Sequence, residues 1–278
     1  MSDNEKFDVS ADWSASAQIN QDKYNEWYET SFNNNEDFWN EHGKRIEWIK
    51  PYTKVKDVSF NKDNFSIKWY EDGALNASAN CIDRHLKDKG DQTAIIWEGD
   101  DPKDSKHITY NELHKEVSKL SNGMKSLGVK KGDRVTIYMP MIPEAAYAML
   151  ACTRIGAIHS VVFGGFSPDS LAGRISDCKS DIVITADEGL RGGKPIPLKK
   201  NTDDAINISG GVRHCIVVKR TGGAIDWHDD RDVWYHELLS DASDDCPPEE
   251  MNADCLLYTS DAADEGLGVD LGGRRIIK

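Results

Sequence analysis

The sequence lacks the features of several large classes of protein. Its 34 lysines and arginines stand against 48 aspartates and glutamates, and the formal net charge of −14 argues against nonspecific binding to nucleic acid or to an anionic membrane. No stretch approaches the roughly 18 apolar residues of a membrane-spanning helix, and the polar N-terminus shows no apolar core of a signal peptide. These absences predict a cytoplasmic protein with no nucleic-acid or membrane partner.

Metal and nucleophile motifs are also missing. The six cysteines are scattered, with no CxxC pair and no Cys/His spacing of a zinc site, so we expect free thiols in a reducing compartment and no metal site. There is no Walker phosphate loop, no GxGxxG motif and no Ser/His/Asp arrangement on a nucleophile elbow. His159 lies in an apolar run and is expected to be a buried structural histidine. The stretch from His228 to Asp230 is expected to be a solvated surface.

From about residue 78 onward, apolar runs alternate with helical patterns. The runs resemble strands that are buried on both faces, and segments with helical periodicity separate them. Strands are expected at 93–100, 133–140, 158–163, 181–185 and 212–218, and helices at 77–90, 108–129, 143–156, 167–180 and 198–206. Thr109, Pro143 and Ser167 are expected to begin helices, and Gly90 and Gly156 to end them. This order predicts an α/β fold with a mostly parallel sheet and crossover helices.

Composition divides the chain into four parts. The first is polar and aperiodic, which predicts disorder. The second is an N-terminal arm, the third is the main α/β domain, and the fourth is a tail with no helix or strand period. These parts are residues 1–20, 21–80, 81–254 and 255–278.

The arm and the acidic end of the main domain carry more specific expectations. In the arm, Tyr24, Trp27 and Tyr28 share one helix face and are expected to be packing anchors. Residues 50–75 are expected to lie on the main domain. The acidic end is expected to hold one short helix, Val233 to Leu239, followed by an exposed loop.

A glycine loop is the first candidate ligand site. In open parallel sheets, ligands bind beyond the carboxyl ends of the strands, and this rule selects the loop after residues 158–163. Gly164 and Gly165 allow close approach to the backbone just before a helix start, which suits a phosphate. Phe163 and Phe166 flank this loop, and such rings usually pack in the core, but a purine can stack on one that is exposed. The alternative is a tight strand-to-helix turn with no ligand.

A basic loop after residues 181–185 is the second candidate. Arg191 and Lys194 flank Gly192 and Gly193 in an otherwise acidic protein. Arginine gives directional contacts to a phosphate and lysine gives a point charge, so the pair can clamp a phosphate. The alternative is a solvated loop. Both loops are expected at the same edge of the sheet.

These segments also carry a specific resemblance. The stretch "IYMPMIPEAAYAMLACTRIGAIHSVVFGGFSPDSLAGRISDCKSDIVITADEGLRGGKPIPLKKNTDDAI", with "YNEWYETSFNNNEDFWNE", "LNASANCIDRHL" and "WHDDRDVWYHEL", closely resembles the AMP-forming acetyl-CoA synthetases, which are adenylate-forming acyl-CoA synthetases. The likeness runs from about residue 20 to about residue 254. It implies the N-terminal part of the large domain of an adenylate-forming enzyme, with the domain incomplete.

The resemblance implies a two-step reaction. Acetate attacks the α-phosphate of ATP, with Mg²⁺ assisting, and the thiol of coenzyme A then displaces AMP from acetyl-adenylate. It assigns the segments matching Phe163, Gly164 and Gly165 and matching Arg191 to Lys194 to the nucleotide end of coenzyme A. One departure is that Lys194 stands where the relatives have arginine. The charge is kept, but the bidentate geometry is lost, which predicts somewhat weaker binding of coenzyme A.

The resemblance also implies that the ATP site lies beyond residue 254. That site needs a Thr/Ser/Gly-rich phosphate loop, an aspartate for the ribose and a mobile C-terminal domain with an essential lysine. We therefore expect no catalytic residue here and no acetate-dependent ATP–pyrophosphate exchange by this chain. Two alternatives stay open: a non-catalytic module that binds coenzyme A or a nucleotide, and a ligase for propionate or another short acid. The last strand of the incomplete sheet is expected to leave an uncovered edge.

The tail poses a separate question. Leu257 to Ser260 reads like the start of a phosphate loop, but Asp261, Asp264 and Glu265 follow and would repel a phosphate. The tail "CLLYTSDAADEGLGVDLGGRRIIK" resembles a translated sequencing-library adapter. We expect the native reading frame to end near Asp254, and the same codons in the source genome would contradict this.

Overall fold

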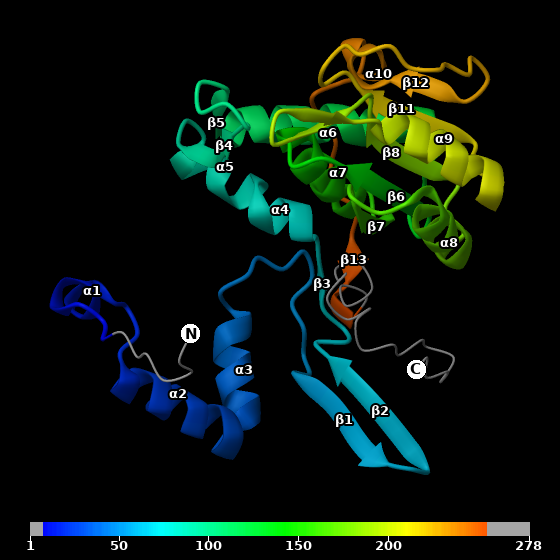
Figure 1. The fold of residues 1–278 in the computed structure, drawn as a ribbon. Coiled ribbons are helices and arrows are strands. Elements are labelled where there is room, and N and C mark those ends of the chain that lie inside the picture. Colours follow the sequence, from blue (N-terminus) through cyan, green and yellow to red (C-terminus); the bar gives the residue numbers. More distant parts are fainter. Residues whose placement is uncertain (1–7, 255–278) are drawn as a thin grey trace, which may run out of the picture.

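The computed structural model describes residues 8–254 and is built around a central sheet (Figure 1). Five strands lie in the order β12, β11, β8, β6, β7. They are β6 (Arg134–Met139), β7 (Ile158–Phe163), β8 (Ile182–Ala186), β11 (His214–Val218) and β12 (Asp232–Trp234). Every neighbouring pair is parallel, which confirms the predicted α/β fold.

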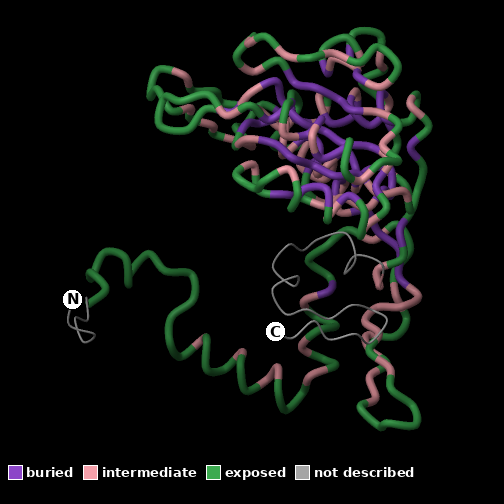
Figure 2. The backbone as a smooth tube through the Cα atoms, turned by 45° about the vertical axis from the view of Figure 1, so that its right-hand side comes forward, coloured by how far each residue is buried: buried purple, intermediate pink, exposed green. Residues whose placement is uncertain are grey.

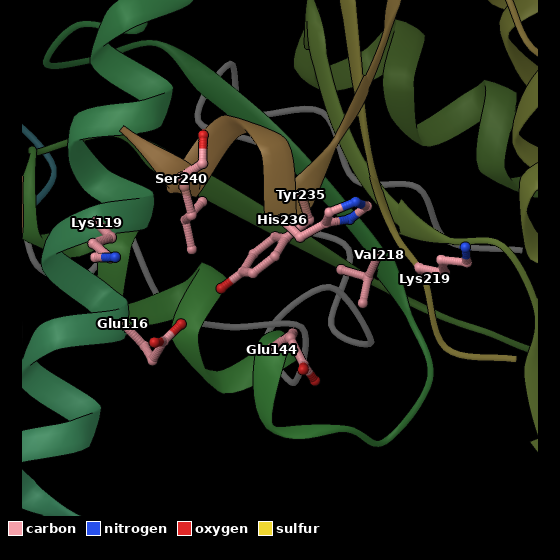
Figure 3. A pocket seen from close by; sticks show the side chains of 9 residues that line it. Glu116, Lys119, Glu144, Val218, Lys219, Tyr235, His236 and Ser240 are labelled. Atoms are coloured by element: carbon pink, nitrogen blue, oxygen red, sulfur yellow. The ribbon is translucent and has the colours of Figure 1, made fainter. Parts of the chain in front are cut away.

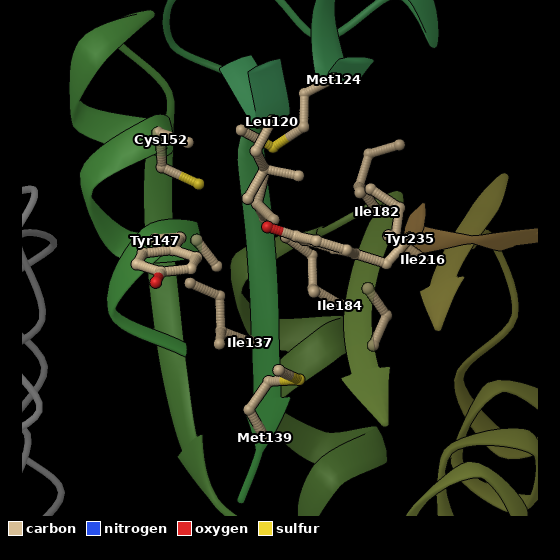
Figure 4. Packing of buried hydrophobic residues seen from close by; sticks show 14 of the residues in the cluster. Leu120, Met124, Ile137, Met139, Tyr147, Cys152, Ile182, Ile184, Ile216 and Tyr235 are labelled. Atoms are coloured by element: carbon tan, nitrogen blue, oxygen red, sulfur yellow. The ribbon is translucent and has the colours of Figure 1, made fainter. Parts of the chain in front are cut away.

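Helices cover both faces of this sheet. α6 (Tyr110–Ser126), α7 (Pro143–Arg154) and α10 (Tyr235–Ser240) lie on one face, and α8 (Pro168–Cys178) and α9 (Leu198–Ser209) lie on the other. In Figure 4, Ile137 and Ile184 of the sheet face Leu120 of α6 and Tyr147 of α7. Buried backbone is concentrated in this part of the molecule (Figure 2), so apolar burial stabilises it most.

The helix boundaries follow the expected signals. The hydroxyl of Thr109 accepts a hydrogen bond from the backbone N–H of Glu112, and the carboxylate of Glu112 accepts one from the N–H of Thr109. This capping box opens α6. Pro143 is the first residue of α7, and Ser167 caps α8. Gly156 follows the end of α7 with φ +71°, a left-handed conformation that favours glycine.

Several elements differ from the expected ones. The predicted helix 77–90 is divided into α4 (Ala77–Cys81) and α5 (Asp83–Lys89). The strand β4 (Thr93–Glu98) pairs antiparallel with an unpredicted strand, β5 (Ser105–Thr109). Val233 belongs to β12, so the predicted helix begins only at Tyr235.

The N-terminal arm extends away from the sheet (Figures 1 and 2). The expectation that residues 50–75 lie on the main domain is wrong for residues 56–69, which form a β-hairpin that points away from the sheet. Tyr24 and Tyr28 are 56% and 62% exposed, so they are not packing anchors within residues 8–254; Trp27 does contact the ring of His42. A helix also occupies part of the segment predicted to be disordered. The elements are α1 (Ala11–Ser16), α2 (Gln21–Asn33), α3 (Asn35–Gly43), β1 (Lys56–Asn61) and β2 (Asn64–Trp69).

The stem of the arm is fixed by the acidic end of the domain. β3 (Ala74–Leu75) pairs antiparallel with β13 (Met251–Asn252). The buried amide of Asn76 donates hydrogen bonds to the carbonyl oxygens of Thr153 and Glu249, at 2.9 and 2.8 Å. The acidic end is therefore not simply an exposed loop, and its Cys246 is fully buried.

The edges of the central sheet are β7 and β12. In β7, Val161 and Phe163 are 38% and 62% exposed. The open apolar edge thus includes β7 and is not confined to the last strand, as the sequence analysis expected.

Candidate functional site

The strand order places a topological switch point between β6 and β8. The chain runs from β6 to β7 on one side and then returns to β8 on the other side of β6. Ligands of open α/β sheets bind at such a point, beyond the carboxyl ends of the strands. The glycine loop follows β7 and the basic segment follows β8, so the structure places both beyond the carboxyl ends of the strands, beside this switch point.

The basic segment is a β-hairpin and not a loop. β9 (Gly189–Arg191) and β10 (Lys194–Ile196) are antiparallel, and Arg191 pairs directly with Lys194. Gly192 and Gly193 form the two-residue turn with φ of +56° and +73°, which explains the two glycines. We call residues 189–196 the basic hairpin.

The two cations of the basic hairpin are available to a ligand. Arg191 and Lys194 are both exposed, and within the described part of the chain neither forms an ion pair. Because they flank one tight turn, their charges add at the turn. The hairpin can therefore attract an anion such as a phosphate.

The glycine loop is held from below by Tyr138. The buried hydroxyl of Tyr138 lies 3.2 Å from the carbonyl oxygen of Gly164 and 2.9 Å from that of Phe166, and it accepts a hydrogen bond from the Asn201 amide. Burial raises the pKa of Tyr138, so it remains a donor near neutral pH. A Cβ at Gly164 would lie 3.2 Å from the carbonyl oxygen of Met139, so the close approach favours glycine.

Replacing Tyr138 by phenylalanine is expected to loosen this loop. The change leaves the carbonyl oxygens of Gly164 and Phe166 without their donor, at a cost of about 1–3 kcal/mol. Amide hydrogen exchange should accelerate in residues 164–167, and chemical denaturation should report the lost stability. Tyr110→Phe is the control because the Tyr110 side chain serves no loop carbonyl. Equal stability of the two variants would contradict the prediction.

Aromatic rings flank the glycine loop. The rings of Phe163 and Phe166 meet edge to face with centroids 5.9 Å apart, and the guanidinium of Arg174 lies 5.3 Å from the Phe166 centroid. Phe163 is exposed, so one of its faces can receive a planar ring.

Leu198 joins the two candidate segments. A Cβ on Gly164 would lie 3.7 Å from Cδ2 of Leu198, and one on Gly189 would lie 3.3 Å from its Cδ1. Both segments thus pack on one buried side chain at the start of α9. The structure brings together the residues that the sequence analysis selected separately.

Asp187 is a residue that the sequence analysis missed. Its buried carboxylate accepts hydrogen bonds from the backbone N–H groups of Glu188, Arg220 and Gly222, at 2.7, 2.8 and 2.8 Å. It therefore fixes the loop after β11 beside the root of the basic hairpin. The sequence signal that could have identified Asp187 was a carboxylate placed directly after a buried strand.

A separate hollow of about 480 Å³ lies at the carboxyl end of β11 (Figure 3). In Figure 3 the hydroxyl of Tyr235 points toward Glu116 and Glu144. Burial raises the pKa of Tyr235 well above 10.0, and the two carboxylates raise it further. Lys119 and Lys219 also line the hollow and offset the charges of the two carboxylates. The hollow therefore has no excess of positive charge, so it suits a phosphate less than the basic hairpin does.

The remaining candidates carry no site. His159 in β7 is partly buried, its Nδ1 has no hydrogen-bond partner, and burial lowers its pKa. Within residues 8–254, no group of three or more metal-binding side chains is assembled, at His228 to Asp230 or elsewhere. The five described cysteines are free, and burial raises the pKa of Cys152 and Cys215 to about 12.

Comparison with profiles of known families identifies the family to which the chain belongs. The sequence profile described as "AMP-binding enzyme" matches residues 82–260. The chain belongs to the AMP-binding enzyme family. A second profile, "Acetyl-coenzyme A synthetase N-terminus", matches residues 24–81, which is most of the arm. The family match takes in Leu257 to Ser260, which, like the rest of the predicted tail, lies outside the described residues.

Individual relatives agree with this family. The chain is 61% identical over 267 residues to the acetyl-coenzyme A synthetase of Methylocella silvestris and 61% identical over 272 residues to that of Parvibaculum lavamentivorans. The alignments cover 95% and 97% of this chain but 41% and 42% of the relatives. The chain thus spans about two fifths of the length of these AMP-binding relatives.

A solved structure shows the same fold. Acetoacetyl-CoA synthetase from Streptomyces lividans superposes with a TM-score of 0.73 over 87% of this chain and 36% of that chain, at 20% sequence identity. At that identity the likeness concerns the fold alone. The parallel sheet and its helices are therefore shared with this solved protein despite low sequence similarity.

Proposed function

We propose that the whole protein is a cytoplasmic acetate–CoA ligase that forms acetyl-CoA from acetate, ATP and coenzyme A. The relatives at 61% identity carry the name acetyl-coenzyme A synthetase, which supports this choice over a propionate-type ligase. Among residues 8–254, no helix has both the length and the apolar character needed to cross a membrane. The proposed reaction passes through acetyl-adenylate, with Mg²⁺ stabilising the phosphate charges of ATP.

We further propose that the described region holds the nucleotide end of coenzyme A. The observation that carries this is the basic hairpin, with two exposed cations flanking one glycine turn at the switch point. Arg191 gives a phosphate directional hydrogen bonds, and Lys194 adds charge without a planar fork. The backbone N–H groups of Gly192 and Gly193 lie at the same turn.

The glycine loop completes this proposed site. Gly164 and Gly165 keep the backbone open to a ligand, and the exposed ring of Phe163 offers a stacking face for adenine. Tyr138 and Leu198 hold the loop and the hairpin in place from the protein side. In this arrangement the residues bind and orient coenzyme A, and they perform no bond-making step.

Calorimetric titration of the purified chain tests the site. We expect coenzyme A to bind, and dephospho-coenzyme A, which lacks the 3′-phosphate, to bind more weakly because it offers less charge to the basic hairpin. ATP alone is the comparison ligand. Absence of binding by coenzyme A, or equal binding by both forms, would contradict the proposed placement. If the chain binds coenzyme A but neither it nor the whole protein has ligase activity, the result would instead favour the alternative of a non-catalytic binding module.

A further inference from the structure

The turn of the basic hairpin is already occupied by an anionic group of the protein. The backbone N–H of Gly193 donates a hydrogen bond to the carboxylate of Asp100 at 3.1 Å. The two residues lie 93 positions apart in the sequence. Asp100 belongs to the segment Gly99–Asp104 between β4 and β5, which we call the acidic loop.

The acidic loop is anchored without help from the Asp100 side chain. The N–H of Gly99 donates to the carbonyl oxygen of Asp104 at 2.7 Å, and the carboxylate of Asp104 pairs with Arg220 at 2.8 Å. Arg220 also lies over the ring of Trp97, 5.0 Å from its centroid, and the Trp97 indole N–H donates to the carbonyl oxygen of Met141 at 2.7 Å. The exposed Asp100 carboxylate can therefore leave Gly193 while the loop stays in place.

The charges around the turn explain what this contact does. Arg191 and Lys194 flank the Gly193 N–H on the two strands of the hairpin. A phosphate that contacts both cations would lie at the backbone N–H between them, and the Asp100 carboxylate accepts a hydrogen bond from that N–H. A carboxylate that stays nearby repels the incoming phosphate.

We propose that Asp100 is a specificity-determining residue that occupies the phosphate position of the basic hairpin until a ligand phosphate displaces it. This inference rests on one part of the proposed coenzyme A site, the binding of a phosphate at the basic hairpin. Displacement requires an anion that interacts with both cations more strongly than one carboxylate does. Asp100 therefore lowers the affinity of the hairpin for every anion and favours ligands with doubly charged phosphate groups over carboxylates.

Two variants of Asp100 test the proposal against a matched control. Asp100→Asn keeps a hydrogen-bond acceptor and removes the charge, and Asp100→Ala removes both. Asp101→Asn is the control because it loses the same charge from the same loop, while its carboxylate accepts from the N–H of Lys103 and not from the hairpin. Calorimetry with coenzyme A and with inorganic pyrophosphate gives the affinities, and the amide resonance of Gly193 reports the contact directly.

We expect both Asp100 variants to bind coenzyme A about fivefold more tightly than the wild type, the effect of one exposed charge at contact distance. The control should stay within about twofold, and the Gly193 resonance should move in the Asp100 variants before any ligand is added. Unchanged or weaker binding by both Asp100 variants would overturn the proposal and leave the coenzyme A site standing. If coenzyme A binds to no form but pyrophosphate binds more tightly to the Asp100 variants, the coenzyme A site fails and the role of Asp100 stands. If neither ligand binds to any form, both fail.

Discussion

Replacing Lys199 by methionine is expected to destabilise the protein by about 3–5 kcal/mol. The Lys199 side chain is fully buried, and its ammonium lies 2.7 Å from the carboxylate of Asp203 and 2.8 Å from that of Asp232. It also donates to the carbonyl oxygen of Asp226 at 3.1 Å. Methionine fills a similar volume but leaves two buried carboxylates with Arg231 as their remaining cation. Urea denaturation followed by circular dichroism measures the change.

The next residue supplies the control. Lys200 forms the same i,i+4 type of pair with Asp204, at 2.6 Å, but its side chain is exposed. Lys200→Met removes an equal charge from the same helix and should leave the denaturation midpoint nearly unchanged, because exposed pairs are well solvated. Similar losses for the two variants would show that burial of the Lys199 network is not what stabilises the fold.

Acid titration gives a second readout of the same network. Burial raises the pKa of Asp232, but hydrogen bonds from Arg231 and Lys199 outweigh it and lower that pKa below the ordinary 3.8. A depressed folded pKa contributes stability above pH 3.8 that is lost as the pH falls through the folded value. In Lys199→Met the carboxyl loses one of these partners, so the acid-side loss of stability due to Asp232 should shrink.

Replacing both Arg191 and Lys194 by methionine is expected to weaken binding of coenzyme A by about 10²- to 10⁴-fold. Each lost charge-assisted hydrogen bond to a phosphate costs about 1.5–3 kcal/mol, and the two residues are cross-strand partners at one turn. The glycine turn and the strand pairing remain, so the fold should be unaffected. Calorimetry with coenzyme A measures the loss.

Two companion variants define the cause of that loss. The double variant Lys54→Met/Lys62→Met removes two charges at the β1–β2 hairpin of the arm, which points away from the sheet (Figure 1). It should bind coenzyme A like the wild type. Lys194→Arg restores a planar fork and should bind as tightly as the wild type or more tightly. If the control pair weakened binding as much as the double variant, net charge and not the basic hairpin would explain the effect.

The core of the fold was readable from the sequence because its strands are continuous apolar runs. Ile182 to Ala186 and His214 to Val218 carry an unambiguous pattern. β12 was missed because it has three residues and begins with Asp232, a buried carboxylate whose partner Lys199 lies elsewhere in the chain. Buried ion pairs interrupt the apolar pattern on which strand prediction depends.

The position of the candidate site was predictable from the sequence, but its hairpin form and its contact with Asp100 were not predicted. The edge rule selected Gly164, Gly165 and Arg191 to Lys194 correctly as neighbours of the sheet edge, and their role toward coenzyme A stays a prediction. The hairpin form had a usable signal, since a Gly-Gly pair between short strands favours a two-residue turn. Asp100 had none, because its contact depends on how the acidic loop docks on the sheet.

The pairing of β3 with β13 has a consequence for the order in which the protein assembles. Asn76 donates to the carbonyl oxygen of Thr153, but its contact with Glu249 spans 173 residues of chain, so the stem of the arm is completed only after nearly all described residues have left the ribosome. Among the described residues, the stem therefore joins an early segment of the chain to a late one. The arm also carries the exposed aromatic residues Tyr24, Tyr28 and Phe32, so we expect the nascent arm to bind holdase chaperones before the stem is complete.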